Sequence, residues 1–86
     1  MYQIIFSKKA LKFLGKIPRD YQIKIKESIK RLSENPFQMD IKKMHSSSEA
    51  THRLRIGSYR IFLCIDSEAK EIIVANIKRR TSQTYQ

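Results

Sequence analysis

The stretch Thr51–Asp66, THRLRIGSYRIFLCID, decides the fold that the sequence predicts. Side chains alternate between the two faces of a strand, so Arg53 and Arg55 are expected to share a face. Gly57-Ser58 interrupts the alternation, and such a pair between two alternating runs predicts a tight hairpin turn. Arg60 follows the turn, and no acidic residue precedes it in the stretch. The hairpin therefore predicts an arginine surface suited to a phosphate-rich ligand.

Upstream of the hairpin, the pattern predicts one strand and two helices. Residues 2–6 form a short apolar strand that ends at Ser7, a favourable N-cap for a helix whose buried face would carry Ala10, Leu11, Leu14 and Phe13. A second helix is expected over residues 19–34, where apolar side chains recur at helical spacing: Tyr21, Ile25, Ile29 and Leu32. Asn35-Pro36 ends that helix. The short connection predicts an antiparallel helical hairpin.

Downstream, residues 41–45 are a candidate short strand, and residues 71–78 predict a last strand because β-branched side chains dominate them. Residues 61–65 and 72–75 are nearly continuous apolar runs, so alternation leaves open which of their faces meets the helices. The predicted order is β-α-α-β-β-β, with three antiparallel strands after the helical hairpin. This arrangement belongs to the α+β class, a mostly antiparallel sheet covered by helices on one face.

Length and composition predict one folded domain over residues 1–86, since 86 residues with 41% hydrophobic content suffice for a single core. Eighteen basic and eight acidic residues give a net charge of +10. Residues 1–40 and 41–86 each carry nine basic and four acidic groups, so the surplus is not a tail. A surplus of this size indicates a polyanionic partner, either nucleic acid or an acidic protein.

Several classes of protein are not expected. No apolar run approaches the ~18–20 residues that span a bilayer, and residues 1–6 do not resemble a signal peptide, so we expect a cytoplasmic protein without a membrane partner. Cys64 is the single cysteine, which leaves no internal disulfide. With one Cys and two His, we expect neither a metal site nor a cofactor.

The chain resembles the RelE/ParE superfamily of toxins from toxin–antitoxin pairs. Two segments carry the resemblance, HRLRIGSYR over residues 52–60 and KRRTSQTY over residues 78–85. In the first segment, basic and apolar residues alternate and are followed by Gly, Tyr and Arg. The second segment is a cluster of basic residues near the end of the sequence, followed by a tyrosine. Both occur in order, and the strand and helix pattern of the whole chain agrees.

The resemblance implies a function for particular residues. In the RelE branch, such toxins cleave mRNA in the ribosomal A site without a metal, and the ribose 2′-hydroxyl attacks the adjacent phosphate. By resemblance, the catalytic residues are Arg60, Arg79 and Tyr85, and the residues that bind RNA phosphate are Arg53, Arg55, Lys78 and Arg80. The implied partners are the ribosome, mRNA and a cognate acidic antitoxin that wraps the basic surface.

The sequence also departs from the RelE pattern. Arg53 and Arg55 stand where that branch carries lysines, and Asn76-Ile77-Lys78 stands where many relatives have a histidine. Arginine is a poor proton carrier, so the general base stays unassigned. Two alternatives remain: a ParE-like toxin that inhibits DNA gyrase without nuclease activity, and a non-catalytic module that binds RNA or antitoxin.

The remaining polar and aromatic candidates have simpler interpretations. His52 is expected on the strand face opposite Arg53 and Arg55, which favours a structural role. Tyr59 alternates with Ile61, so core packing and recognition both fit. The lysines of the first helix are interpreted as a solvated face: Lys8, Lys9, Lys12 and Lys16.

Overall fold

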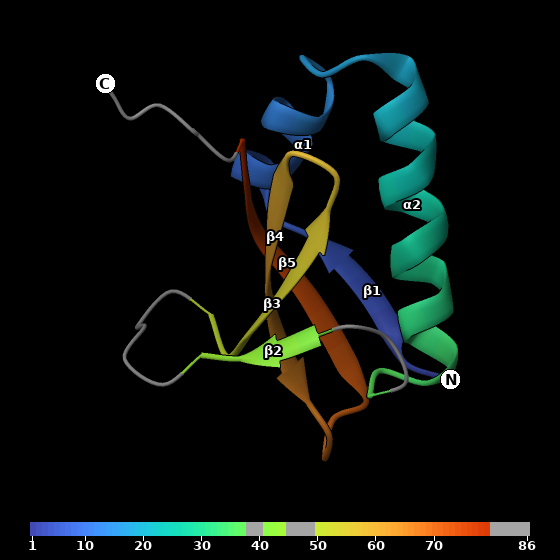
Figure 1. Cartoon of the computed structure of the whole chain (residues 1–86). Helices are drawn as coiled ribbons and strands as arrows, with labels where there is room; N and C mark the ends of the chain where they lie inside the picture. Colours follow the sequence, from blue (N-terminus) through green and yellow to red (C-terminus); the bar gives the residue numbers. More distant parts are fainter. Residues whose placement is uncertain (38–40, 45–49, 80–86) are drawn as a thin grey trace.

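The computed structural model of the chain describes residues 1–37, 41–44 and 50–79. In chain order the elements are β1 (Gln3–Phe6), α1 (Lys8–Leu14), α2 (Arg19–Glu34), β2 (Ile41–Lys43), β3 (His52–Ile56), β4 (Tyr59–Asp66) and β5 (Glu71–Arg79). The α+β class and the order of strand, two helices and strands are confirmed. Figure 1 shows α1 rising to the helix connection and α2 returning beside the sheet, which is the predicted helical hairpin.

The described strands form one five-stranded sheet in the order β1-β5-β4-β3-β2. The strands from β2 to β5 pair antiparallel with their neighbours, whereas β1 pairs parallel with β5. The sheet is therefore mixed rather than purely antiparallel. The reason lies in how the strands are connected. Strand β1 is followed by two helices and then by β2, β3 and β4, and β5 pairs with β1 at the far side of the sheet from β2. The candidate strand at residues 41–45 is present as β2, over residues 41–43.

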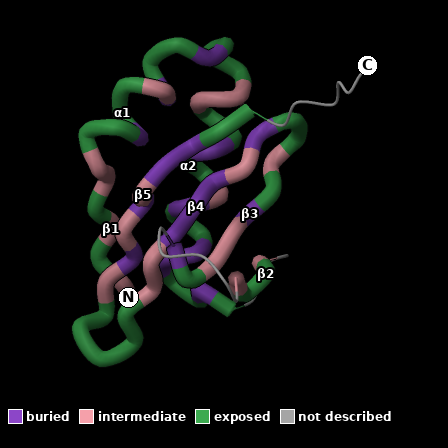
Figure 2. Tube along the Cα trace, turned by 90° about the vertical axis from the view of Figure 1, so that its left-hand side faces the viewer, coloured by how far each residue is buried: buried purple, intermediate pink, exposed green. Residues whose placement is uncertain are grey.

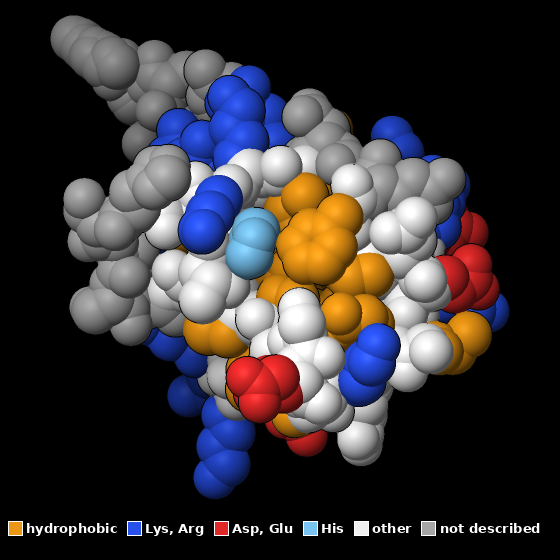
Figure 3. Space-filling model, turned by 90° about the horizontal axis from the view of Figure 1, so that it is seen from below, with side chains coloured by type: hydrophobic (Ala, Val, Ile, Leu, Met, Phe, Trp, Pro, Cys, Tyr) orange, Lys and Arg blue, Asp and Glu red, His pale blue; other side chains and the backbone are white. Residues whose placement is uncertain are grey.

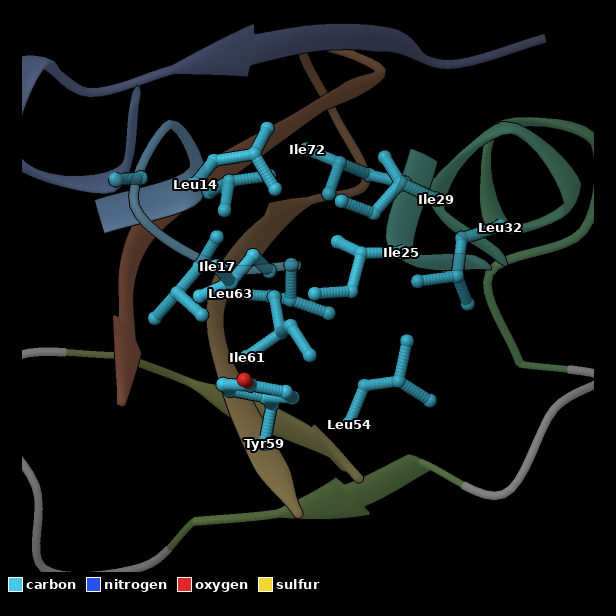
Figure 4. Close-up of a cluster of buried hydrophobic side chains, with 13 residues drawn as sticks. Leu14, Ile17, Ile25, Ile29, Leu32, Leu54, Tyr59, Ile61, Leu63 and Ile72 are labelled. Carbon is cyan, nitrogen blue, oxygen red and sulfur yellow. The ribbon is translucent and has the colours of Figure 1, made fainter. Parts of the chain in front are cut away.

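The core lies between the two helices and one face of the sheet, and Figure 4 shows its side chains. Helix α2 buries the side chains predicted from its spacing, Ile25, Ile29 and Leu32, while Tyr21 is partly buried at its first turn. The sheet contributes the alternating residues Leu54, Tyr59, Ile61 and Leu63. Tyr59 is only 5% exposed, which settles its two interpretations in favour of core packing.

Helix α1 begins as predicted at Ser7, whose side-chain oxygen accepts a hydrogen bond from the Ala10 backbone N–H at 3.0 Å. Ala10 and Leu14, four residues apart, are buried on one face. The prediction that Leu11 shares this face is wrong, because Leu11 is 53% exposed. Adjacent residues in a helix are rotated by about 100°, and in a helix of seven residues only one narrow stripe reaches the core.

A β-bulge in β5 sets the faces of its last residues. Phe62 pairs with Asn76 but Leu63 pairs with Val74, so Ala75 is an extra residue on β5. The Ser7 hydroxyl donates a hydrogen bond to the Ala75 carbonyl at 2.7 Å, which links the start of α1 to the bulge. Before the bulge Val74 faces the core, and after it Ile77 does. Lys78 consequently lies on the face opposite the helices.

The β3–β4 turn packs on α2. Gly57 has a φ of +56°, which suits the first position of a two-residue hairpin turn and favours glycine. A Cβ atom at Gly57 would lie 2.6 Å from the Cε1 atom of Tyr21. The Tyr21 ring also contacts the Tyr59 ring, with centroids 5.1 Å apart. These contacts hold the end of the hairpin against the first turn of α2.

Candidate nucleic-acid interface

Three cationic residues form a row across the open face of the sheet. Arg55 on β3 is the cross-strand partner of Arg60 on β4, and Arg60 is the partner of Lys78 on β5. Directly opposed residues share a face, and neighbouring strands lie about 5 Å apart. Figure 2 views this side of the molecule, with α2 behind the strands. We call Arg55, Arg60 and Lys78 the cationic row.

Arg53 extends the cationic row along the same face of β3. It lies opposite Lys42 on β2 and opposite Phe62 on β4. The Lys78 ammonium lies over the Phe62 ring, 5.1 Å from its centroid, which is a cation–π contact. The open face therefore combines cations with one aromatic side chain.

Arg60 is the central residue of the cationic row and is half-buried. Its Nε atom is buried and has no hydrogen-bond partner among the residues that the structure describes. A buried donor without an acceptor costs about 1–3 kcal/mol. Arginine presents several N–H donors in a planar fork, which suits it to binding an oxyanion.

Arg79 lies at the same end of the sheet but on the other face. Its cross-strand partner is Tyr59, a core residue, so alternation separates it from Arg60 and Lys78. The structure brings Arg53, Arg55, Arg60 and Lys78 together on one face and places Arg79 at the edge, beside α1. Arg80 and Tyr85, the other two predicted site residues, lie outside the described residues.

The acidic groups of β4 and β5 lie at the opposite end of these strands. Asp66 and Glu71 are cross-strand partners at the β4–β5 turn, and Glu68 lies within that turn. Asp66 lies six positions beyond Arg60 along β4, a span of about 20 Å. Within β3, β4 and β5 the cations are therefore gathered toward the β3–β4 turn, whereas the turn at the other end carries Asp66, Glu68 and Glu71 beside Lys70.

His52 lies on the helix side of the sheet, opposite Leu63, which confirms the predicted face. Its ring contacts the Phe37 ring with centroids 6.0 Å apart, and a hydrogen bond of 2.8 Å joins its Nδ1 to the Thr51 hydroxyl. Burial lowers the pKa of His52 from its ordinary 6.5, and Lys43 lowers it further. Figure 3 shows a histidine beside exposed hydrophobic side chains at the lower end of the molecule. His52 is thus not placed to act on a ligand of the cationic row.

Two further findings concern metal-binding groups and membrane-spanning helices. Within residues 1–37, 41–44 and 50–79, no three His, Cys, Asp or Glu side chains gather closely enough to hold a metal ion. No helix in the same residues is both long and apolar enough to cross a membrane.

Sequence reasoning missed two features of this end of the molecule. The Ala75 bulge that aligns Lys78 with Arg60 has no sequence signal, because Ala75 is simply the last residue of the apolar run 72–75. The spacing of Tyr21 predicts a core residue, but its contact with Gly57 depends on how α2 meets the hairpin. The glycine itself was the available signal, since it marks a position where the backbone needs a positive φ.

Comparisons with known proteins agree on one family. A family model described as the ParE toxin of the type II toxin-antitoxin system parDE matches residues 4–83. The curated RelE1 protein of Methanocaldococcus jannaschii is 33% identical over 82 residues, covering 92% of this chain and 90% of the relative.

Solved structures show the same fold. A chain of the archaeal RelE–RelB complex from Pyrococcus horikoshii matches with a TM-score of 0.81 at 22% identity, covering 95% of this chain and 98% of that one. A chain of the RelBE2 toxin–antitoxin complex from Mycobacterium tuberculosis matches with a TM-score of 0.79 at 25% identity, covering 92% and 98%. The isolated Escherichia coli RelE toxin matches with a TM-score of 0.80 at 16% identity, covering 98% and 89%.

Proposed function

This chain belongs to the RelE/ParE superfamily of toxins from toxin–antitoxin systems, and we propose that it is a ribosome-dependent endoribonuclease that cleaves mRNA without a metal ion. As such it would inhibit translation in the cytoplasm, where mRNA and ribosomes are its targets. The RelE branch is favoured because the curated relative and the matching solved structures are RelE proteins or complexes of the RelBE type.

The observation that carries the proposal is the cationic row, with the half-buried Arg60 at its centre. Two arginines and one lysine share one face on three neighbouring strands, and such strands lie about 5 Å apart. A phosphodiester at Arg60 would have cations on both sides. Fixed donors that stabilise developing negative charge commonly lower the barrier of such reactions more than any other single effect.

The proposed reaction begins with the ribose 2′-hydroxyl of the substrate. Its oxygen forms a bond to the adjacent phosphorus while the bond from phosphorus to the 5′-oxygen breaks, leaving a 2′,3′-cyclic phosphate and a free 5′-hydroxyl. One proton leaves the 2′-oxygen and another joins the 5′-oxygen. Arg60 would bind the non-bridging oxygens, and Arg53 and Arg55 would hold neighbouring phosphates. Binding to the ribosome would supply much of the orientation of the codon.

Three further residues enter the proposal through the family resemblance. Arg79 would contact the phosphate from the edge of the sheet, and Arg80 would add a phosphate contact. Tyr85 would stack on a base or orient the 2′-hydroxyl. The general base and general acid are not assigned to a side chain.

The proposed regulator is a cognate acidic antitoxin. The net charge of +10 and the gathering of cations toward the β3–β4 turn favour an acidic chain over the cationic end. Solved relatives include complexes described as RelE with RelB. An antitoxin that covers the cationic row would exclude RNA from Arg60 by occupying the same face.

The test is cleavage in a translation extract, with mRNA 5′ ends mapped at stalled ribosomes. Wild-type protein should create new 5′ ends within codons, and Arg60→Ala should lower the cleavage rate by about 10²–10³-fold. Arg31→Ala, which removes an exposed arginine from α2, is the matched control and should cleave normally. Absence of new ends with wild-type protein, or equal cleavage by Arg60→Ala, would contradict the proposal.

A gyrase-directed function is the second candidate, because the matching family model is described as a ParE toxin. The arginines in place of the RelE lysines also favour it. In this case purified protein should reduce the supercoiling activity of DNA gyrase and leave mRNA intact. Unchanged supercoiling at saturating protein would exclude this candidate.

A further inference from the structure

A groove of about 550 Å³ lies between α1 and the last residues of β5. Strand β1 pairs with β5 only as far as Val74, and within the described part of the chain α1 lies beside β5 after that point. Figure 1 shows α1 next to the C-terminal end of β5. The hydrogen bond from Ser7 to the Ala75 carbonyl holds one end of this groove together.

The walls of the groove carry five cations: Lys9, Lys12 and Lys16 from α1 and its C-terminal turn, and Lys78 and Arg79 from β5. No acidic side chain is among the described residues that line it. Phe13 also lines the groove, and its ring packs edge-on against Tyr59 with centroids 6.2 Å apart. Cations on both walls of one groove add their fields and attract a polyanion.

The groove is continuous with the cationic row, because Lys78 belongs to both. Lys78 is the cross-strand partner of Arg60, and Arg79 is the next residue. A chain of phosphates bound at Arg60 would therefore reach the edge of β5 at Lys78 within about 5 Å. From there the lysines of α1 offer the next cations.

We propose that this groove binds the sugar–phosphate backbone of single-stranded RNA on one side of the phosphate held at Arg60. This inference rests on the proposed function and adds a second phosphate-binding subsite to it. An acidic peptide would also be attracted to the cations, but continuity with the cationic row favours a chain whose charges continue from the scissile phosphate. The lysines of α1 thereby become RNA contacts rather than a solvated face.

The test uses the full-length protein and uridine oligonucleotides of three and twelve nucleotides with 2′-O-methyl groups, which cannot be cleaved by 2′-hydroxyl attack. Dissociation constants are measured by fluorescence anisotropy from 50 to 300 mM salt. The salt slope is the slope of the logarithm of the binding constant against the logarithm of the salt concentration. For the twelve-nucleotide RNA, its magnitude should be about 2 smaller in the variant that combines Lys9→Gln, Lys12→Gln and Lys16→Gln than in wild type. Each contact with single-stranded RNA contributes about 0.7 to this slope. The three-nucleotide RNA should be much less affected.

The matched control removes three exposed cations from α2: Lys26→Gln, Lys30→Gln and Arg31→Gln. It should leave the slope nearly unchanged. Equal slopes for wild type and the groove variant, or equal losses in both variants, would overturn the inference. A groove variant that loses affinity for the antitoxin but keeps its RNA slope would assign the groove to the antitoxin and also overturn it.

This outcome is separable from that of the proposed function. A lower slope without any mRNA cleavage by wild type would keep the RNA groove and reject the nuclease. Cleavage that depends on Arg60 with an unchanged slope would keep the nuclease and reject the groove.

Discussion

Arg55 and Arg60 lie directly opposite each other on β3 and β4, on the face of the sheet that α2 does not cover. Like charges in directly opposed positions destabilise a sheet, by roughly 0.2–1 kcal/mol for pairs of this kind. A hairpin without a ligand gains nothing from this arrangement. The phosphate-binding function proposed for this face would give the pair a role, because it needs two cations at one point.

Removing one of the two charges should therefore stabilise the protein while weakening its function. Arg55→Gln is expected to raise the free energy of unfolding by about 0.5 kcal/mol at low salt, measured by urea denaturation. The gain should shrink at about 1 M salt, where the Debye length is about 3 Å. The same variant should bind single-stranded RNA more weakly than wild type.

Arg31→Gln is the control for this prediction, because Arg31 lies between Glu27 and Glu34 on α2 at helical spacings of four and three residues. Its loss should leave stability unchanged or slightly lower. A destabilised Arg55→Gln, or an equal gain in both variants, would show that repulsion across the hairpin is not the cause.

The contact between Gly57 and Tyr21 predicts a second stability effect. Gly57→Ala should destabilise the protein by more than about 1 kcal/mol, because alanine adopts a positive φ poorly and its Cβ would lie 2.6 Å from the Tyr21 ring. In a double-mutant cycle, Tyr21→Ala should remove the steric part of that cost and leave the backbone part. Strictly additive effects of the two substitutions would contradict the steric contact.

His52 predicts how stability depends on pH. Its pKa is lowered in the folded state, first by burial and then by Lys43, so below the ordinary pKa of 6.5 the unfolded chain binds the proton more readily. The stabilising contribution of neutral His52 is fully present above pH 6.5 and is lost as the pH falls through the lower, folded-state pKa. Unfolding free energies measured from pH 8 to pH 5 should fall more for wild type than for His52→Gln. Parallel curves for the two proteins would refute this assignment.

Ser7 predicts how firmly α1 is held to the sheet. Ser7→Ala removes the N-cap of α1 and the hydrogen bond to the Ala75 carbonyl, so we expect a loss of about 2 kcal/mol in unfolding free energy. Ser7→Asp retains an acceptor for the cap but has no hydrogen to donate when ionised, and should recover only part of the loss. Full recovery in Ser7→Asp would mean that the bond to Ala75 contributes nothing.

The sequence determined those parts of the protein that depend on local chemistry. The start of α1 followed from Ser7, the buried face of α2 from its 3.6-residue spacing, and the β3–β4 hairpin from Gly57 between two alternating runs. Alternation alone placed Arg53 and Arg55 on the face opposite His52. These predictions were correct because each rests on residues within a few positions of one another.

The tertiary structure decided what depends on distant segments. The continuous apolar run in β5 left its faces undetermined, and only the extra residue Ala75, bonded to Ser7, turns Lys78 toward Arg60. The parallel pairing of β1 with β5 could not be predicted either, because it joins partners 68 residues apart and no local pattern specifies it. The arginine hairpin was thus a property of the sequence, whereas its extension into a three-strand cationic row required a bulge that only packing against α1 positions.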